Sequence, residues 1–215
     1  MTNARKAALV TGAGKNIGRA VALGLAEDGF DVAINGASDV KAAESVAAEV
    51  RALGRTAVVI MGDVGTRAEC ARIAAAALAA FGTVDVLVNN AALRPAKPFL
   101  ELTEADWRRV MGVDVEASIW LSQALLPGMV AQGFGRIVNF TGMNAIHGYA
   151  GRAPVSVAKH GLWGLTKSLA KEFAKAGITV NAVSPGPIAA DDDVPGVANS
   201  RTGYVAKVPM ARMGT

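Results

Sequence analysis

The sequence has little of several residue types, and each shortage argues against a class of protein. Its 215 residues include a single cysteine, Cys70, so no disulfide can form within the chain and nothing indicates an oxidising compartment. No apolar run approaches the ~20 residues that span a bilayer, and the N-terminus lacks the charged-then-apolar pattern of a secretory signal. We therefore expect a cytoplasmic protein with a buried or half-buried thiol and no membrane partner.

Clustered positive charge is also missing. The 22 Lys and Arg residues exceed the 18 Asp and Glu residues, but they are scattered and form no basic stripe of the kind that binds nucleic acid. The acidic run at 191–193 is better explained as a solvated loop than as a metal site, because a metal cage needs spaced ligands in a fixed geometry. We expect neither a nucleic-acid partner nor a metal ion.

Aromatic residues make up only 5% of the chain, whereas 52% of its residues are hydrophobic, many of them Ala and Val. That balance suits a parallel sheet packed between alanine-rich helices. The length fits one domain, and no linker, internal repeat or low-complexity tract divides it. We predict a single α/β domain over residues 1–215.

Apolar runs typical of strands alternate with stretches of helical periodicity. The expected strands are 7–11, 31–35, 56–61, 84–88, 136–141 and 178–183. Helices are expected around 17–25, 39–53, 66–82, 103–132 and 155–176. Thr66 and Glu69 should form a capping box, and Pro127 and Gly128 should bend or end the long helix early. Right-handed crossovers between such strands give a Rossmann-type doubly wound sheet of order 3-2-1-4-5-6, with helices on both faces.

A glycine-rich loop follows the first expected strand, where residues 11–18 read Thr-Gly-Ala-Gly-Lys-Asn-Ile-Gly. Small residues there let backbone N–H groups approach a pyrophosphate at the start of a helix. A glycine-rich turn is also an ordinary connection, so this signal is moderate by itself. Ligands of open parallel sheets bind beyond the carboxyl ends of the strands, which makes the segments after the other strands informative.

Three such segments support the same reading. They are Gly-Asp-Val at 62–64, Asn-Asn-Ala-Ala at 89–92 and Ser-Pro-Gly-Pro-Ile at 184–188. With the glycine-rich loop they make the chain resemble, over nearly its whole length, the short-chain dehydrogenase/reductase family, and in layout its β-ketoacyl-acyl carrier protein reductases. The resemblance implies an oxidoreductase that transfers hydride between a nicotinamide dinucleotide and a small carbonyl or alcohol substrate.

The resemblance also implies which residues hold the cofactor. The pyrophosphate would lie on the loop residues Gly12, Gly14, Lys15, Asn16 and Ile17. The adenine would meet Asp63 and Val64, and the adenosine ribose would meet Asn90 and Ala91. The nicotinamide end would meet Pro185, Gly186, Ile188 and the ammonium of Lys159.

The end of the second strand bears on which nicotinamide cofactor binds. A carboxylate there would accept a hydrogen bond from the ribose 2′-OH, but residues 35–38 read Asn-Gly-Ala-Ser. Lys15 can supply positive charge to a 2′-phosphate, and Ser38 can donate a hydrogen bond to it. We expect NADP(H) rather than NAD(H), the alternative being that Lys15 points into water.

The residues that the family uses for proton transfer are largely replaced. The family places a tyrosine four residues before a lysine, which puts both on one helix face. Here those positions hold Val155 and Lys159, while Gly142 stands at the family's serine and Asp114 at its asparagine. Only Lys159 remains of the four, and a valine cannot act as a general acid.

Other groups have to be considered in place of the missing acid. The catalytic candidates are Lys159, Asp114 as a possible partner of that lysine, and the phenol of Tyr149; His147 is a further possible acid. The alternative for Tyr149 and His147 is that one packs on the pocket wall and the other is a loop residue. Three functions therefore stay open: an oxidoreductase with impaired or altered catalysis, a redox-silent NAD(P)-binding subunit or sensor, and non-redox chemistry by Asp114 or His147.

Two further expectations concern assembly and the end of the sequence. Trp107, Trp120 and Trp163 lie on helices that resemble the family's oligomer-forming pair, so we expect a homo-dimer or homo-tetramer. Segment 189–208 resembles the family's substrate loop and should act as a mobile lid. The family continues into another helix and a seventh strand, without which a strand would be left at the sheet edge unless a tail follows residue 215.

Overall fold

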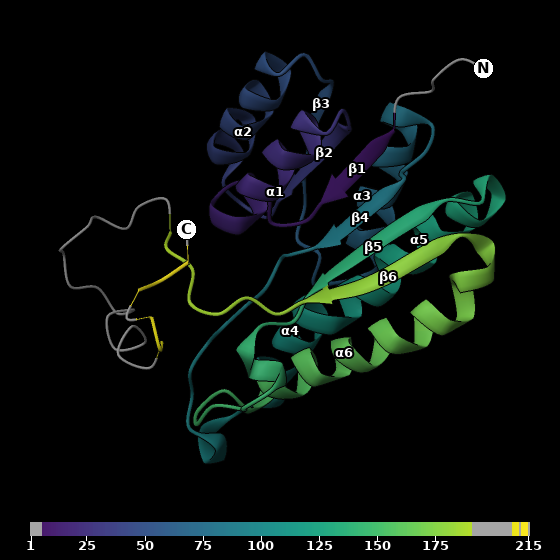
Figure 1. Ribbon diagram of the computed structural model, residues 1–215. Helices are drawn as coiled ribbons and strands as arrows, with labels where there is room; N and C mark the ends of the chain where they lie inside the picture. The colour runs from purple at the N-terminus through teal and green to yellow at the C-terminus, as the bar shows by residue number, and fades with distance from the viewer. Residues whose placement is uncertain (1–5, 191–207, 211, 215) are drawn as a thin grey trace.

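The computed structural model describes residues 6–190, 208–210 and 212–214 (Figure 1). In this part of the chain six parallel strands form one sheet of order β3-β2-β1-β4-β5-β6, which confirms the predicted Rossmann-type α/β class. The strands are β1 (Ala7–Val10), β2 (Asp31–Gly36), β3 (Ala57–Met61), β4 (Val86–Asn89), β5 (Gly135–Phe140) and β6 (Ile178–Val183). Most of the expected lid and the acidic run at 191–193 lie outside the described residues.

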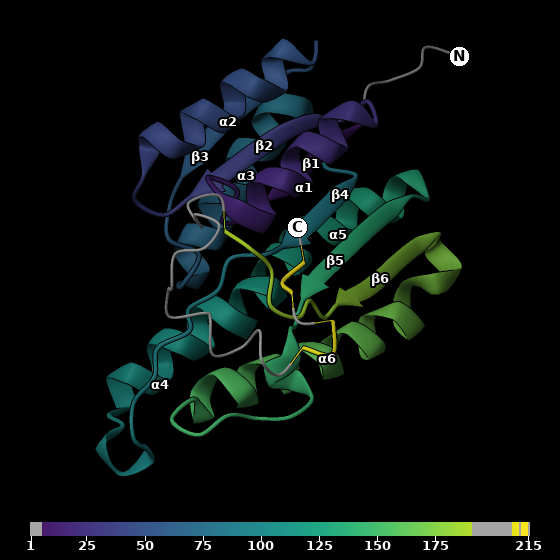
Figure 2. The same cartoon turned by 60° about the vertical axis from the view of Figure 1, so that its left-hand side comes forward.

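Six α-helices of the described chain surround the sheet (Figures 1 and 2). They are α1 (Asn16–Glu27), α2 (Val40–Ala52), α3 (Arg67–Phe81), α4 (Glu104–Met111), α5 (Ala117–Gln132) and α6 (Ala153–Phe173). None of the helices described is long and apolar enough to cross a membrane.

Two apolar layers pack against the sheet, one on each face. Because successive strand residues point to opposite faces, Val10 packs with α1 and α2, whereas Leu9 packs with α3 and α5. Alanines such as Ala22 of α1 and Ala47 of α2 are fully buried against the strands. The small helix residues that the composition revealed therefore bring the helices close to the sheet.

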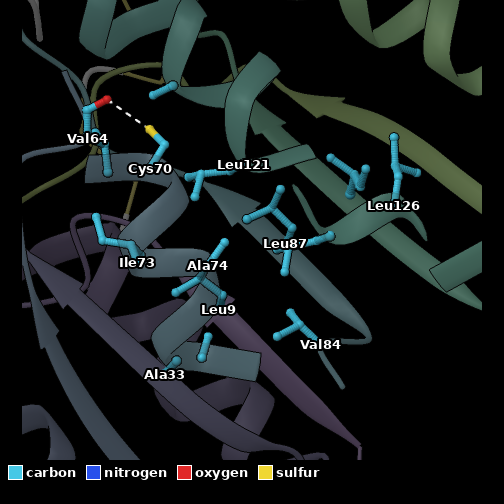
Figure 3. Close-up of a cluster of buried hydrophobic side chains, with 14 of the residues drawn as sticks. Leu9, Ala33, Val64, Cys70, Ile73, Ala74, Val84, Leu87, Leu121 and Leu126 are labelled. Carbon is cyan, nitrogen blue, oxygen red and sulfur yellow. Dashed lines mark hydrogen bonds between the residues drawn. The ribbon is translucent and has the colours of Figure 1, made fainter. Parts of the chain in front are cut away.

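Cys70 lies on α3 and packs among Val64, Ile73 and other apolar side chains (Figure 3). Its thiol donates a hydrogen bond to the carbonyl of Val64 at 3.1 Å. Burial raises the pKa of this thiol to about 11, so it stays protonated near neutral pH. The prediction of a buried thiol is confirmed, and Cys70 is a packing residue.

The long helix expected from residue 103 onward is built differently from the prediction. Thr103 and Asp106 form a reciprocal capping box that starts α4, and a π-helical segment, Gly112–Glu116, joins α4 to α5. Pro127 does not end this region early, because α5 continues to Gln132. Buried neighbours such as Met129 hold the helix across the proline, and the chain leaves the helix only at Gly133, in the left-handed region.

The capping box expected at Thr66 is only half formed. The Thr66 hydroxyl accepts a hydrogen bond from the backbone N–H of Glu69 at 3.3 Å. The Glu69 carboxylate does not return to Thr66; it binds the guanidinium of Arg72 at 2.8 Å. An ion pair one turn along the helix has replaced the second bond of the box.

Candidate active site

A cavity of ≈ 860 Å³ lies beyond the carboxyl ends of the strands, as expected for an open parallel sheet. Twelve of the predicted cofactor residues line it: Gly12, Lys15, Asn16, Ile17, Asp63, Val64, Asn90, Ala91, Lys159, Pro185, Gly186 and Ile188. Gly14 and Ser38 are absent from its wall. The volume suits a dinucleotide-sized or smaller ligand.

Strand β4 holds the glycine-rich loop in place. The side-chain amide of Asn90 donates hydrogen bonds to the carbonyls of Thr11 at 2.9 Å and Gly12 at 3.1 Å. The Thr11 hydroxyl accepts from the backbone N–H groups of Asn90 and Ala91, both at 3.0 Å. The motifs after β1 and β4 are therefore parts of one structure, and the amide of Asn90 is occupied in building it.

The loop and the start of α1 fit a phosphate group. A Cβ on Gly18 would lie 2.2 Å from the carbonyl oxygen of Gly12, so only glycine allows the helix to start this close to the loop. Asn16 stands where the family usually has glycine, and it adopts a left-handed φ of 51°, which asparagine tolerates better than most residues. Lys15 is the N-cap residue of α1, and its side chain makes no hydrogen bond to the first turn. The backbone N–H groups of that turn are therefore not capped by the N-cap side chain.

The end of β2 holds no carboxylate that is free for a ribose. Asn35 is buried, and its amide donates to the carbonyls of Ile60 and Gly62, both at 3.0 Å. The carboxylate of Asp39 accepts from the backbone N–H of Ala42 at 2.9 Å and caps α2. Ser38 is exposed and does not line the cavity, whereas Lys15 does.

Asp63 is engaged by Arg109, a residue that the sequence reading did not consider. The guanidinium binds both carboxylate oxygens, at 3.1 and 2.7 Å, and the backbone N–H of Gly65 donates to Oδ1 at 2.9 Å. Partial burial raises the pKa of this carboxyl, but the bonds from Arg109 and Gly65 outweigh burial and hold it below the usual value. Asp63 is therefore an ionised, fixed acceptor at the cavity wall.

Lys159 and Asp114 form a buried pair at the other end of the cavity. The Lys159 ammonium donates to the carbonyl of Phe140 at 2.9 Å and lies 3.7 Å from Asp114 Oδ2, an ion-pair distance that is too long for a hydrogen bond. Asp114 Oδ1 accepts from the backbone N–H of Leu93 at 2.7 Å, while buried Oδ2 has no hydrogen-bond partner. The predicted proximity of these two residues is confirmed.

Burial disfavours the charged form of both residues, so it shifts their pKa values in opposite directions. It lowers the pKa of Lys159 and raises the pKa of Asp114. The Asp114 carboxylate offsets part of the shift of Lys159. Only Lys159 reaches the cavity wall; Asp114 lies behind it, on the π-helical segment. The lysine can therefore meet a ligand, and the aspartate acts on the lysine.

A buried polar chain fixes the helix that carries Lys159. The amide of Asn89 donates to Asn139 Oδ1 at 2.8 Å, and the amide of Asn139 donates to the hydroxyl of Thr166 at 2.9 Å. This chain links β4, β5 and α6, and all three residues are buried. The sequence reading quoted Asn89 and Asn139 within motifs but did not recognise that they position α6.

Two of the three replaced family positions, Val155 and Gly142, have structural roles of their own. Val155 is fully buried in an apolar cluster with Val110, Val115, Ala158 and Leu162 and does not line the cavity. Gly142 adopts φ 74°, so a serine placed there would be strained in this backbone conformation. Restoring the family's residues at these positions would therefore require local repacking.

Of the two suggested substitutes for the acid, only one faces the cavity. Tyr149 lines it, whereas His147 is exposed and absent from its wall. The wall also contains Arg94 and Arg152, both missed by the sequence reading because single arginines in loops carry no motif. Among the described residues, no three His, Cys, Asp or Glu side chains are grouped closely enough to hold a metal ion.

The comparisons with known proteins agree with this geometry. Residues 6–195 match the short chain dehydrogenase family. The chain belongs to that family. Short-chain dehydrogenases are oxidoreductases that bind nicotinamide dinucleotides, which fits a glycine-rich loop, a buried lysine and a cavity at the carboxyl edge of this sheet.

Three relatives illustrate the range of similar short-chain dehydrogenases. The chain is 36% identical to the 3-oxoacyl-[acyl-carrier-protein] reductase FabG of Staphylococcus epidermidis, over 97% of this chain and 86% of the relative. The acetoin dehydrogenase YohF of Salmonella typhimurium superimposes with a TM-score of 0.89 at 35% identity, covering 98% and 83% of the two chains. A metagenomic short-chain oxidoreductase in complex with NADP gives a TM-score of 0.81 at 33% identity, covering 85% and 84%.

Proposed function

We propose that this short-chain dehydrogenase is an NADP(H)-dependent oxidoreductase for a small carbonyl or alcohol substrate, with Lys159 as its proton donor. The observation that carries the proposal is that Lys159, buried and ion-paired with Asp114, lines the cavity, whereas Val155 is buried in an apolar cluster and does not. A bound nicotinamide would supply the hydride. Lys159 would hold a proton at its Nζ for the substrate oxygen, and Asp114 is the positioning residue that keeps this ammonium charged.

The preference for NADP(H) rests on charge at the adenosine end of the cavity. Asn35 is uncharged, and the Asp39 carboxylate caps α2 and does not line the cavity, whereas Lys15 does. A 2′-phosphate at the end of β2 would therefore meet a cation and no carboxylate of the cavity wall there. The complex of a similar oxidoreductase with NADP supports the same assignment. In this arrangement, the remaining acceptor capacity of Asp63 would serve the adenine, and Asn90 and Ala91 would border the ribose.

The reduced catalytic set supports a second candidate, a cofactor-binding protein with little redox turnover that acts as a partner subunit or sensor. A positioned general acid contributes roughly 10²- to 10⁴-fold to a rate, and Val155 supplies none of this. The two candidates share the cofactor site and differ in the role of Lys159. A measurement of turnover therefore distinguishes the two candidates, whereas a measurement of cofactor binding does not.

Calorimetry with NADPH and NADH, followed by NADPH oxidation on a panel of ketones, tests the proposal. We expect tighter binding of NADPH, weakened by Lys15→Gln, and measurable turnover that Lys159→Ala lowers by roughly 10²-fold or more. Tyr149→Phe identifies the donor: a loss as large as that of Lys159→Ala would transfer the role to Tyr149. Binding without turnover, or activity indifferent to Lys159→Ala, would favour the redox-silent candidate, and no binding of either dinucleotide would refute both.

We further propose a homo-dimer or homo-tetramer in the cytoplasm. Trp107 on α4 and Trp163 on α6 are 37% and 44% exposed, so part of each indole is available for contact with a second copy of the chain. The single buried Cys70 suits a reducing compartment.

A further inference from the structure

The cavity wall is rich in positive charge. Five of its residues are basic, Lys15, Arg94, Arg109, Arg152 and Lys159, whereas Asp63 is the one acidic residue among them in the described chain. Three of these cations already have an assigned role: Arg109 binds Asp63, Lys159 faces Asp114, and Lys15, at the start of α1, is proposed to meet the cofactor. Arg94 and Arg152 have no role assigned so far.

Neither of these two arginines forms an ion pair with a carboxylate of the described chain. The ion pairs and side-chain hydrogen bonds found among the described residues include neither guanidinium. Arg152 is half-buried and Arg94 is more exposed, and both line the cavity. Guanidinium groups that face a cavity without a counter-ion are available to an anionic ligand.

The backbone brings the two arginines to the same end of the cavity. Arg94 follows Leu93, whose backbone N–H donates a hydrogen bond to Asp114. Three residues after Arg94, the backbone N–H of Lys97 donates to the carbonyl of Gly151 at 2.8 Å. Gly151 immediately precedes Arg152, so the segment after β4 and the segment before α6 lie side by side (Figure 1). The backbone N–H of Arg152 in turn donates to the carbonyl of Tyr149 at 3.1 Å.

This end of the cavity is the one that contains the buried pair. The Arg94 guanidinium lies close enough to act on both members, lowering the pKa of Asp114 and that of Lys159. The effect on Lys159 lowers the fraction of the amine that is protonated before the reaction, because a neighbouring cation disfavours the charged form. An anion bound between the arginines and the lysine would reverse that effect and keep Lys159 charged.

We propose that the substrate is a carbonyl or alcohol compound that bears a carboxylate or phosphate group, and that Arg94 and Arg152 bind this group while the substrate oxygen faces Lys159. This inference rests on the proposed function and names the substrate class of that same site. The adenosine end is assigned to the segments after β1, β2 and β3 and to Asn90 and Ala91 directly after β4. Arg94 lies farther along the segment that leaves β4, and Arg152 follows β5. The arginines are therefore placed for the substrate and not for the cofactor's 2′-phosphate.

Matched charged and neutral probes test this on the full chain saturated with NADP⁺, which cannot reduce a ketone. The first pair is acetoacetate and methyl acetoacetate, and the second is dihydroxyacetone phosphate and dihydroxyacetone. Dissociation constants are measured by ligand-observed nuclear magnetic resonance for the natural protein, Arg94→Gln, Arg152→Gln and the double variant. Arg108→Gln is the control, since this guanidinium lies on α4, is 76% exposed and pairs with Glu104 away from the cavity.

The natural protein should bind at least one charged probe roughly 10-fold or more tightly than its neutral partner, and rising salt should weaken this preference. The double variant should bring the two affinities to within about 2-fold, each single variant should cause part of the loss, and Arg108→Gln should cause none. The pair that shows the preference identifies carboxylate or phosphate as the group recognised.

Equal affinities in both pairs, no binding of any probe, or a preference retained in the double variant would overturn the inference. So would a double variant that weakens NADP⁺ binding but leaves the probe preference unchanged, because the arginines would then serve the cofactor. Absence of NADP⁺ binding to the natural protein is a separate result, measured first, and it counts against the proposed function itself.

Discussion

Lys159 carries the charge on which the proposed chemistry depends, and three features of its environment shift its pKa. Burial lowers its pKa below the ordinary lysine value of 10.5, the Asp114 carboxylate raises it, and the Arg94 guanidinium lowers it again. A proton donor must be charged before the reaction. The balance of these effects therefore sets the pH range in which the enzyme can reduce a carbonyl.

The pH dependence of ketone reduction follows from that balance. The rate should fall as the pH rises through the pKa of Lys159, at a value below 10.5, because the deprotonated amine has no proton to donate. Asp114→Asn removes the carboxylate that favours the charged amine, so the fall should begin at a lower pH. The measurement is kcat/KM for NADPH-dependent reduction across the pH range.

Glu104→Gln serves as the control for this experiment, because that carboxylate is 75% exposed on α4 and pairs with Arg108. Its profile should coincide with that of the natural protein. A profile of Asp114→Asn that also coincides with the natural one would show that Asp114 does not act on the donor.

At the scale of the element, helix α1 offers a pair of glycines in opposite surroundings. A Cβ at Gly18 would meet the Gly12 carbonyl oxygen at 2.2 Å and the Asn90 amide nitrogen at 2.7 Å, whereas a Cβ at Gly24 would meet nothing within 4 Å. The first glycine is required by packing of the helix on the loop. The second only weakens the helix.

Alanine at these two positions should therefore change stability in opposite directions. Gly24→Ala should raise the free energy of unfolding by about 0.4–1 kcal/mol through lower chain entropy. Gly18→Ala should lower it by roughly 1–3 kcal/mol, because the loop must shift, and should weaken NADPH binding as well. Urea denaturation with and without NADPH measures both effects, and two alanine variants of equal stability would contradict this account of the loop.

The ends of elements were the least predictable part of the fold, for identifiable reasons. Pro127 predicts a break because it lacks an N–H group, but burial of α5 residues on both sides of it outweighs the lost hydrogen bond. The π-helical segment that holds Asp114 leaves no mark in local periodicity. Its position depends on contact with another segment, since a Cβ on Gly112 would lie 2.5 Å from the carbonyl oxygen of Gly65.

At the scale of the whole molecule, the exposed tryptophans predict self-association. Light scattering should give the mass of two or four chains, and Trp163→Glu on α6 should lower it by placing a charge in the contact. Leu53→Glu is the matched control, because Leu53 follows α2 and is similarly exposed, at 41%. A monomeric natural protein, or the same loss of mass in both variants, would refute the proposed interface.

The candidate site was only partly predictable at this scale. The sequence indicated the glycine-rich loop, Lys159 and its pairing with Asp114, because these residues stand in motifs at known places of a parallel sheet. It did not indicate Arg94 or Arg152, whose segments are joined in the folded chain by the Lys97–Gly151 backbone bond. Nor did it show that Arg109 forms an ion pair with Asp63, since one residue lies on a helix and the other in a loop far away in the sequence.

By itself, the sequence determined the α/β class, the strand order and the place of the cavity, because hydrophobic periodicity, turn glycines and the rules of parallel crossovers are local or nearly local properties. It also determined that a valine and a glycine stand at two of the family's reactive positions. Only the tertiary structure decided where the charges meet: which arginines keep a partner, that Lys159 is buried beside Asp114, and that Val155 packs away from the cavity. Electrostatic interactions and burial depend on distances between segments remote in sequence, and those distances are fixed only when the chain is folded.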